Sequence, residues 1–548
     1  MGESFVIMRS VRPLSLLALL SVCAMAAAQA TPEDTAKIVN EGKNHNQVMK
    51  TLKGLTDLGP RLTSSPNLRR AQEFAMTKFK GYGLKNVHLE EWGKVPLGFE
   101  RGKRQSARMI LPFESEMQFT TMNWMPGTNG KQRGRAVMAP TTLEEAAAMK
   151  DQMKGAWIVM PASWTMRGPG GPAATDEAAK KKEADLKAAI DGSGLLGRIY
   201  GARDERLHSS GTWRDKTFEN HPKGPENVMI VVRKSDHDRI TRNLDYKRPV
   251  ELEFEAENRF IKGELPQYNV IAEIPGTEKP NEVVIVCGHL DSWNSPGSQG
   301  TCDNGTGSVN TIESARIIMA SGVKPKRTIR FILWSGEEQG LLGSRAYVEK
   351  HLGEMDGISA VLNDDGGTNY QGGYVGVASM KPMLEEAFAP TVKAFPELPM
   401  AFDVVEKMPL GGSSDHAPFN GEGVPGFFTK ESGRADYGKV WHTQFDKYDE
   451  AIPEYLVQSS TNHAVVAFYL AQAPTLLPRA PKPEKPARAA DIPKAIALGS
   501  DQNSYPWIML FDEHDVNQPH DHEDDWTLEV IDRLKRTARG IFSTMRLR

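Results

Sequence analysis

The chain has 548 residues, of which 39% are hydrophobic and 8% aromatic, and its formal net charge is −3. This length predicts two to four structural units with enough apolar side chains for a packed core. The nearly balanced charge excludes any global electrostatic attraction to nucleic acid or to an anionic membrane.

The N-terminus has the pattern of an export signal. Arg9 and Arg12 precede the apolar run LSLLALLSVCAMAAA, and residues 28–30 (Ala-Gln-Ala) fit the small-x-small rule of a cleavage site. The run is too short for a typical membrane span. We therefore expect residues 1–30 to be a signal peptide cleaved near Ala30. The mature protein would be extracytoplasmic, either periplasmic or secreted, without a stable membrane span.

The next two regions differ in character. Residues 31–125 begin with helical apolar spacing over 35–55 and 67–83, followed by a strand pattern over 87–92. Residues 126–258 contain short strand-like runs and one helical pattern, which together predict a small α/β insert.

Residues 259–477 contain apolar runs that each end in polar residues: VVIVCGHLDSW, TIRFILWSGEE and ISAVLNDDGG. Runs of this kind suit buried parallel strands, and helical patterns lie between them. We therefore predict an α/β fold with a mostly parallel central sheet and helices on both faces. Ligands of such sheets bind beyond the carboxyl ends of the strands, where these polar residues fall.

The C-terminal part reads differently from the rest. Residues 478–503 are rich in Pro, Ala and Lys and predict an extended linker. Residues 504–548 form a C-terminal extension with amphipathic helical spacing near its end.

The segment GHLDSWNSPGSQGTCDNGTG carries the densest chemical signal. His289 and Asp291 follow a strand, and a carboxylate two residues after a histidine can orient its ring for metal binding. Asp303 lies in a Gly-rich turn, where a carboxylate is accessible enough to bridge two cations. Alone, an H-x-D pattern is a weak indicator of a metal site.

Acidic pairs follow the next two strands. Glu337 and Glu338 point in different directions, so one can bind metal while the other serves as a base, although acidic residues also favour helix N-termini. Asp364 and Asp365 compete for a ligand role in a segment that also resembles an ordinary turn.

His442, in WHTQFD, completes the set, although a lone histidine is more often structural. Two histidines and three carboxylates at the strand ends of one sheet suit zinc, with one carboxylate shared between two ions. Two such ions lower the pKa of a water and polarise a carbonyl, and a free glutamate can then accept the proton.

The motifs GHLDSW, DNGTG, KPKRTIRFILWSGEEQG and DGGT resemble those of the di-zinc aminopeptidase and glutamate carboxypeptidase family, whose members include bacterial leucine aminopeptidase and plasma-type glutamate carboxypeptidases. The resemblance covers residues from about 35 to 477. It implies a zinc aminopeptidase-like fold with a protease-associated-type insert over 126–258.

The resemblance also implies residue roles. His289 and Asp365 would bind one zinc ion, Glu338 and His442 the other, and Asp303 would bridge. Two further roles, the general base and the partner of His289, would fall to Glu337 and Asp291.

One position departs from the family pattern. Some members place Tyr just before the last histidine to stabilise an oxyanion, whereas this chain has Trp441. Trp441 is expected to line the substrate pocket, and the pair Asp415 and His416 is expected either to line that pocket or to support the metal ligands from behind.

The leading expectation is a zinc-dependent exopeptidase, of the aminopeptidase type, acting on peptides or dipeptides. A carboxypeptidase or dipeptidase with the same metal centre is a second reading, and a non-catalytic receptor-like module is a third from a different class. H-E-x-x-H and G-x-S-x-G are absent from the sequence, which argues against zincin and serine-hydrolase chemistry.

Two cysteines, Cys287 and Cys302, would remain after signal cleavage. They are consistent either with one local disulfide or with two buried thiols.

Overall fold

The computed structural model describes residues 30–162, 164–165, 168–169, 177–409 and 414–482. The predicted signal peptide, most of the predicted linker and the C-terminal extension therefore lie outside the described residues.

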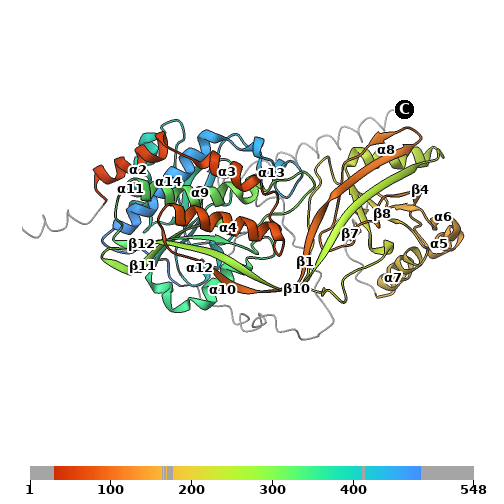
Figure 1. Ribbon diagram of the computed structural model, residues 1–548, viewed down its shortest axis with the longest axis horizontal. Coiled ribbons are helices and arrows are strands. Elements are labelled where there is room, and N and C mark those ends of the chain that lie inside the picture. Colours follow the sequence, from red (N-terminus) through yellow and green to blue (C-terminus); the bar gives the residue numbers. More distant parts are fainter. Residues whose placement is uncertain (1–29, 163, 166–167, 170–176, 410–413, 483–548) are drawn as a thin grey trace, which may run out of the picture. The chain divides into compact units, whose positions relative to one another are not determined.

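Four parallel strands form the part of the sheet that carries the polar strand ends, and Figure 1 labels two of them, β11 and β12. In spatial order they are β16 (Gly426–Phe428), β13 (Ile358–Asn363), β11 (Lys279–His289) and β12 (Arg327–Trp334). The runs of β11, β12 and β13, which are rich in Val, Ile, Leu and Phe, are buried on both sides, as the prediction of parallel strands requires.

Alternate side chains of β11 enter two different cores. Val284 and Val286 pack in one core with α9 (Thr306–Ala320) and α14 (Pro453–Gln472). Ile285 and Cys287 pack in the other core with side chains of α10 (Leu342–Lys350) and α12 (Ala417–Gly421). Helices therefore cover both faces of the sheet, as predicted.

The helical pattern predicted over 35–55 divides into two helices, α2 (Pro32–Asn44) and α3 (Val48–Thr56). The side-chain oxygen of Asn46 accepts a hydrogen bond from the N–H of Val48 at 2.8 Å and starts the second helix. The next predicted helix is α4 (Pro66–Gly81), which begins at Ser65 as its cap.

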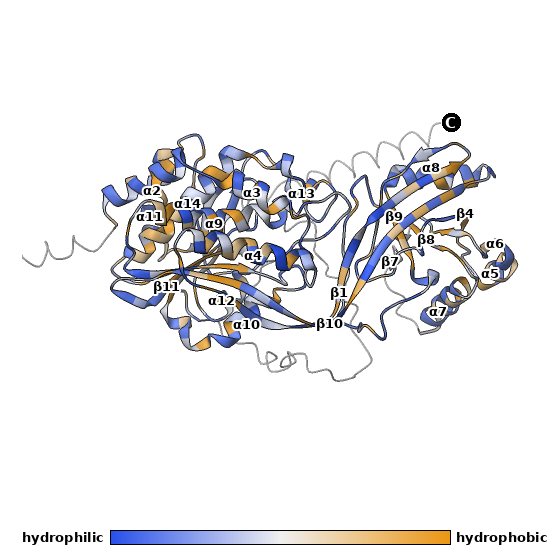
Figure 2. Cartoon of the chain, in the orientation of Figure 1, coloured by the Kyte–Doolittle hydropathy of each residue, from blue (hydrophilic) through white to orange (hydrophobic). Residues whose placement is uncertain are grey.

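A long antiparallel ribbon extends the sheet and makes it mixed. β1 (Lys85–Leu111) pairs with β10 (Glu251–Ile274), and β10 also pairs antiparallel with β12 and with β4 (Gln132–Met138). Residues 251–256 of β10 alternate between glutamate and apolar residues, so one side of the ribbon is buried (Figure 2).

The region between β1 and β10 contributes a second parallel group of strands, in the order β4, β5, β8 and β9, with β3 antiparallel at its edge. Cores lie on both faces of this group. The bounds of its elements are β3 Phe119–Thr121, α5 Leu143–Ala148, α6 Lys150–Met153, β5 Trp157–Val159, α7 Glu177–Asp191, β8 Gly197–Gly201, β9 Met229–Val232 and α8 Lys234–Asp245. Its likeness to a protease-associated domain stays a prediction.

Further elements complete the described part of the chain. They are β2 Ser115–Glu116, β6 Trp164–Thr165, β7 Gly168–Pro169, η1 Pro225–Asn227, η2 Thr301–Gly305, η3 Leu352–Gly357, β14 Tyr370–Val377, α11 Lys381–Ala394, β15 Ala401–Val405, β17 Lys430–Ser432, α13 Tyr437–Val440 and η4 Tyr448–Glu450. None of the helices in the described part of the chain combines the length and the apolar character that crossing a bilayer requires.

Candidate metal centre

Three neighbouring parallel strands deliver polar side chains to one edge of the sheet. β11 ends at His289, β12 is followed by the Glu337–Glu338 pair, and β13 is followed by Asp365. Because parallel strands end at the same edge, side chains distant in sequence meet there.

The structure brings the five predicted ligands together. Nε2 of His289 lies 2.9 Å from Oδ1 of Asp365 and 3.4 Å from Oδ1 of Asp303. Nε2 of His442 lies 3.3 Å from Oδ2 of Asp303 and 3.1 Å from Oε2 of Glu338. The two oxygens of Asp303 therefore face two different imidazoles, which is the arrangement of a bridging carboxylate.

These donor groups fit zinc. Oδ2 of Asp303 is buried and accepts no hydrogen bond from the described residues. The ligand atoms of His289, Asp303 and Glu338 lie within 4.8 Å of one another, and so do those of His289, Glu337 and Asp365. Imidazole nitrogens and carboxylate oxygens at such separations match the ligand set that zinc prefers.

Without a cation, bound protons balance part of the negative charge of the clustered carboxylates. Burial alone would lower the pKa of His442, but Glu338 and Asp303 outweigh it and raise the pKa to about 9. Burial, together with the charge of Asp303, raises the pKa of Glu338 to about 7. Burial alone would raise the pKa of Asp303, but hydrogen bonds and attraction from His289 and His442 hold that pKa well below the ordinary value. Protons and a metal ion therefore compete for the same atoms.

Asp364 and Asp365 have different surroundings. The carboxylate of Asp364 accepts hydrogen bonds from Nδ2 of Asn310 and Nε2 of Gln371, each at 2.9 Å. Asp365 instead faces His289. Of the two aspartates, Asp365 is therefore the one that faces another proposed ligand, and its role as a ligand stays a prediction.

The proposed base lies beside the cluster. Oε2 of Glu337 is 3.9 Å from Nε2 of His289. Burial raises the pKa of Glu337 well above its ordinary value, and Asp365 and Asp415 add to the increase. A carboxyl group with a raised pKa is a stronger proton acceptor, which suits the role of a general base.

Asp291 holds two segments of the centre. Its carboxylate accepts hydrogen bonds from Oγ1 of Thr63 at 2.6 Å and from the N–H groups of Gly336 at 3.0 Å and Glu337 at 3.4 Å. Nδ1 of His289 lies 3.0 Å from the backbone oxygen of Asp291 and 3.7 Å from its carboxylate. The backbone oxygen, rather than the expected carboxylate, is therefore the nearer partner of the ring.

The three residues expected in the substrate pocket occupy different surroundings. Trp441 stacks on His442, with ring centroids 3.9 Å apart, and Trp293 meets the same ring edge-on at 5.7 Å. Asp415 is fully buried, and this burial raises its pKa to about 8, whereas burial lowers the pKa of His416 to about 4. A substrate contact by Asp415, His416 or Trp441 stays a prediction.

Sequence reasoning missed the loop of residues 204–214, which reaches the metal-binding segments. The N–H of Ser209 donates to the oxygen of His442 at 2.9 Å. The side chain of Gln444 accepts from the N–H of Leu207 at 2.8 Å and donates to the oxygen of Glu205 at 2.9 Å. No local pattern signals these contacts, because the partners lie more than two hundred residues apart.

Tyr437 is a second residue that the sequence did not single out. Its ring packs against Gly367, where an added Cβ would lie 2.6 Å from the ring. Burial raises the pKa of its hydroxyl, and Asp303, Asp365 and Glu338 add to this effect. The hydroxyl of Tyr437 therefore lies close enough to the proposed ligands to feel their charge. This matters because the chain has Trp441 at the position where some members of the family have Tyr.

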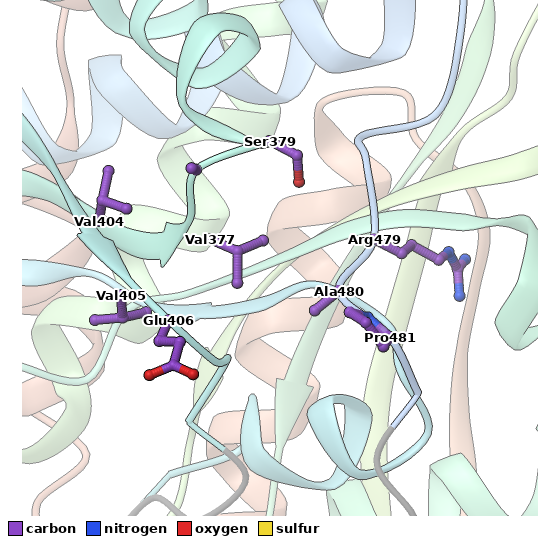
Figure 3. Close-up of a pocket in the computed structure, with 9 residues that line it drawn as sticks. Val377, Ser379, Val404, Val405, Glu406, Arg479, Ala480 and Pro481 are labelled. Carbon is purple, nitrogen blue, oxygen red and sulfur yellow. The ribbon is translucent and has the colours of Figure 1, made fainter.

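Two of the cavities among the described residues have similar volumes. One, of about 450 Å³, is lined in part by Cys302, Thr368, Tyr437 and Val440, which are close in sequence to the proposed ligands. The other, of about 460 Å³, lies between β14, β15 and residues 479–481 (Figure 3), farther in sequence from those ligands, and neither lining includes any of the predicted site residues. The first cavity is therefore the better candidate for a substrate side chain.

Cys287 and Cys302 are both buried free thiols. Of the two interpretations left open by the sequence, the local disulfide is thus wrong, and burial raises the pKa of both thiols. They act as small apolar residues beside the proposed ligands.

Comparisons with known proteins give a family and several relatives. Residues 269–467 match peptidase family M28. Carboxypeptidase Q of Bos taurus is 28% identical over 441 residues, which cover 80% of this chain and 88% of that protein. Leupeptin-inactivating enzyme 1 of Streptomyces exfoliatus is 36% identical over 176 residues, or 32% of this chain and 37% of that enzyme.

A crystal structure of a peptidase M28 precursor from Shewanella amazonensis SB2B has the same fold. The TM-score is 0.56 at 24% identity, and the match covers 82% of this chain and 98% of that chain. The predicted resemblance and the predicted α/β fold are thereby confirmed.

Proposed function

Because the chain is a zinc metallopeptidase with a peptidase family M28 domain, we propose that it is an exported aminopeptidase with two zinc ions. The observation that carries this proposal is the position of Asp303, whose two carboxylate oxygens face His289 and His442 separately. A single ion would need only one of these faces.

In the proposed centre, His289 and Asp365 hold one ion, Glu338 and His442 hold the other, and Asp303 bridges. When bound, such ions polarise a peptide carbonyl and lower the pKa of water. Glu337 accepts the proton of the attacking water and passes it to the leaving amine, because it is the glutamate beside the cluster that the ligand set leaves free. Asp291 fixes the backbone from which Glu337 projects.

The charge around the centre supports the aminopeptidase reading. Burial raises the pKa of several carboxyl groups near the ligands, among them Glu337, Asp415 and Glu431. Where the proposed zinc ions leave such a carboxyl group unbound, its ionised form attracts an incoming α-ammonium group and repels an incoming carboxylate. The alternative, a carboxypeptidase or dipeptidase, is supported by the length over which the chain matches carboxypeptidase Q.

A panel of peptides tests this proposal. We expect the enzyme to cleave a tripeptide with a free amino terminus and an amidated carboxyl terminus, and to leave the N-acetylated peptide with a free carboxyl terminus intact. The reverse preference would establish the carboxypeptidase alternative, and cleavage of dipeptides alone would establish a dipeptidase. Activity should disappear with a chelator and return with zinc.

The receptor-like alternative has a separate outcome. If the protein binds zinc but cleaves no peptide of the panel, the centre is not catalytic. The position of Glu337 beside the five proposed ligands argues for turnover.

Export is proposed from the sequence of residues 1–30. Mass spectrometry of the protein recovered outside the cytoplasm should give a mature N-terminus close to Thr31.

A further inference from the structure

Arg61 is a fully buried cation next to the proposed metal centre. Its guanidinium donates three hydrogen bonds to backbone oxygens: Nε to Leu290 at 2.6 Å, Nη1 to Gln299 at 3.0 Å and Nη2 to Gly300 at 2.7 Å. These acceptors are the two ends of one loop, residues 290–300, which joins His289 to the segment of Asp303. The fork of one side chain thus closes the loop that separates two proposed ligands.

The backbone of Arg61 joins the same loop. The N–H of Arg61 donates a hydrogen bond to Oγ of Ser292 at 3.0 Å. The N–H of Ser292 in turn donates to the backbone oxygen of Arg61 at 3.2 Å. Gly300 permits this close packing, because it has a φ of +60° and an added Cβ would lie 2.2 Å from Oγ of Ser292. Both the backbone and the side chain of Arg61 therefore hold the conformation of this loop.

Asp446 is a second residue that holds the segment of Asp303. The carboxylate of Asp446 accepts hydrogen bonds from the N–H of Cys302 at 2.5 Å and from that of Asp303 at 3.3 Å. Burial lowers the pKa of Arg61 to about 10, and Asp446 and Asp291 oppose the decrease, so the guanidinium stays charged at neutral pH. A fixed positive charge thus lies in a region where carboxylates predominate.

We propose that Arg61 is a positioning residue for the metal centre, which sets the separation of His289 and Asp303 by closing the loop of residues 290–300. This inference rests on the proposed zinc centre. Ligands must be held within about 0.5 Å of their productive positions for tight binding. A loop that loses its closure must be ordered again each time that metal binds, and affinity falls accordingly.

The chain offers a matched control in Arg327. This arginine is also fully buried, and its guanidinium contacts the backbone oxygens of Leu470 and Ala473 as well as Glu282. It stands at the start of β12, at the end of the strand away from Glu337 and Glu338. Loss of Arg327 should therefore cost stability without changing the metal centre.

The experiment compares Arg61→Met, Arg61→Lys and Arg327→Met in the full chain after removal of metal. Zinc affinity is measured by competition with a chromogenic chelator, and thermal unfolding of the metal-free proteins is measured in parallel. We expect Arg61→Met to lose zinc affinity by about 10- to 100-fold, the range seen when groups that orient metal ligands are removed. Arg327→Met should bind zinc with the affinity of the wild type, even if its unfolding temperature falls as much as that of Arg61→Met.

Arg61→Lys keeps the charge but cannot form the three-bond fork, so it should lose at least about tenfold in zinc affinity. It also serves as the test if Arg61→Met fails to fold. The inference is overturned if Arg61→Lys binds zinc like the wild type, or if Arg327→Met loses zinc to the same extent as the Arg61 variants.

The wild type separates this inference from the proposed function. A wild type that binds two zinc ions and cleaves peptides, alongside Arg61 variants with unchanged affinity, overturns only the role of Arg61. A wild type that binds no zinc contradicts the proposed function and this inference together.

Discussion

The carboxylate of Asp291 accepts a hydrogen bond from the backbone N–H of Glu337 at 3.4 Å, although the two residues are 46 positions apart. The same carboxylate accepts from Gly336, while the backbone oxygen of Asp291 lies 3.0 Å from His289. One residue thus connects a proposed metal ligand to the proposed base, and this link leads to the first two predictions.

Substitution of Glu337 by Gln should remove the base while leaving the zinc ligands in place. We expect kcat to fall by about 10²- to 10⁴-fold, the usual contribution of a general base, with zinc content unchanged. The measurement is steady-state kinetics together with metal analysis of the dialysed protein. Near-full activity of Glu337→Gln would exclude this role.

Substitution of Asp291 by Ala should remove the acceptor of the Gly336 and Glu337 N–H groups. Leaving buried donors without partners costs about 1–3 kcal/mol, so the unfolding temperature and kcat should both decrease. Asp291→Asn keeps one oxygen as an acceptor and should be the milder change in both measurements. Equal effects of the two substitutions would show that the hydrogen bonds are not the cause.

Trp441 should support His442 through the stacked contact of the two rings, whose planes differ by 25°. We expect Trp441→Ala to weaken binding of the zinc ion that His442 is proposed to hold, and Trp441→Phe to retain most of that affinity, because a flat ring still fits the stack. Zinc titration with two resolved binding events measures this difference. The prediction would be contradicted if both zinc-binding affinities of Trp441→Ala equal those of the wild type.

The stability of the metal-free protein should depend on pH. His442 has a folded-state pKa of about 9 against an ordinary 6.5, and Glu338 one of about 7 against 4.5. Both groups bind protons more tightly in the folded than in the unfolded chain, so the free energy of unfolding decreases as pH rises from 4.5 to about 9. Bound zinc replaces these protons and should weaken the decrease.

Thermal unfolding across this pH range, with chelator and with excess zinc, checks the prediction. A chelated protein that becomes more stable with rising pH would mean that these groups do not carry the raised pKa values. His442→Gln should flatten the upper part of the chelated profile, because the group that titrates near pH 9 is then absent.

The sequence by itself determined the parts that depend on local pattern. Apolar runs of Val, Ile and Leu specified β11, β12 and β13, because such runs are stable only where both faces of a strand are buried. The polar residues directly after these runs had to emerge at one edge, so His289, Glu338 and Asp365 were predictable as neighbours. Residue chemistry then indicated zinc.

The tertiary structure alone decided how the ligands are held. Arg61, Asp446 and Gln444 act on loops more than one hundred residues away, and their contacts follow from the packing of the chain rather than from any spacing. The same holds for the antiparallel pairing of β10 with β12, which makes the sheet mixed. Hydrogen bonds between distant loops carry no periodic signal, since each needs only one suitable donor and acceptor brought together by the fold.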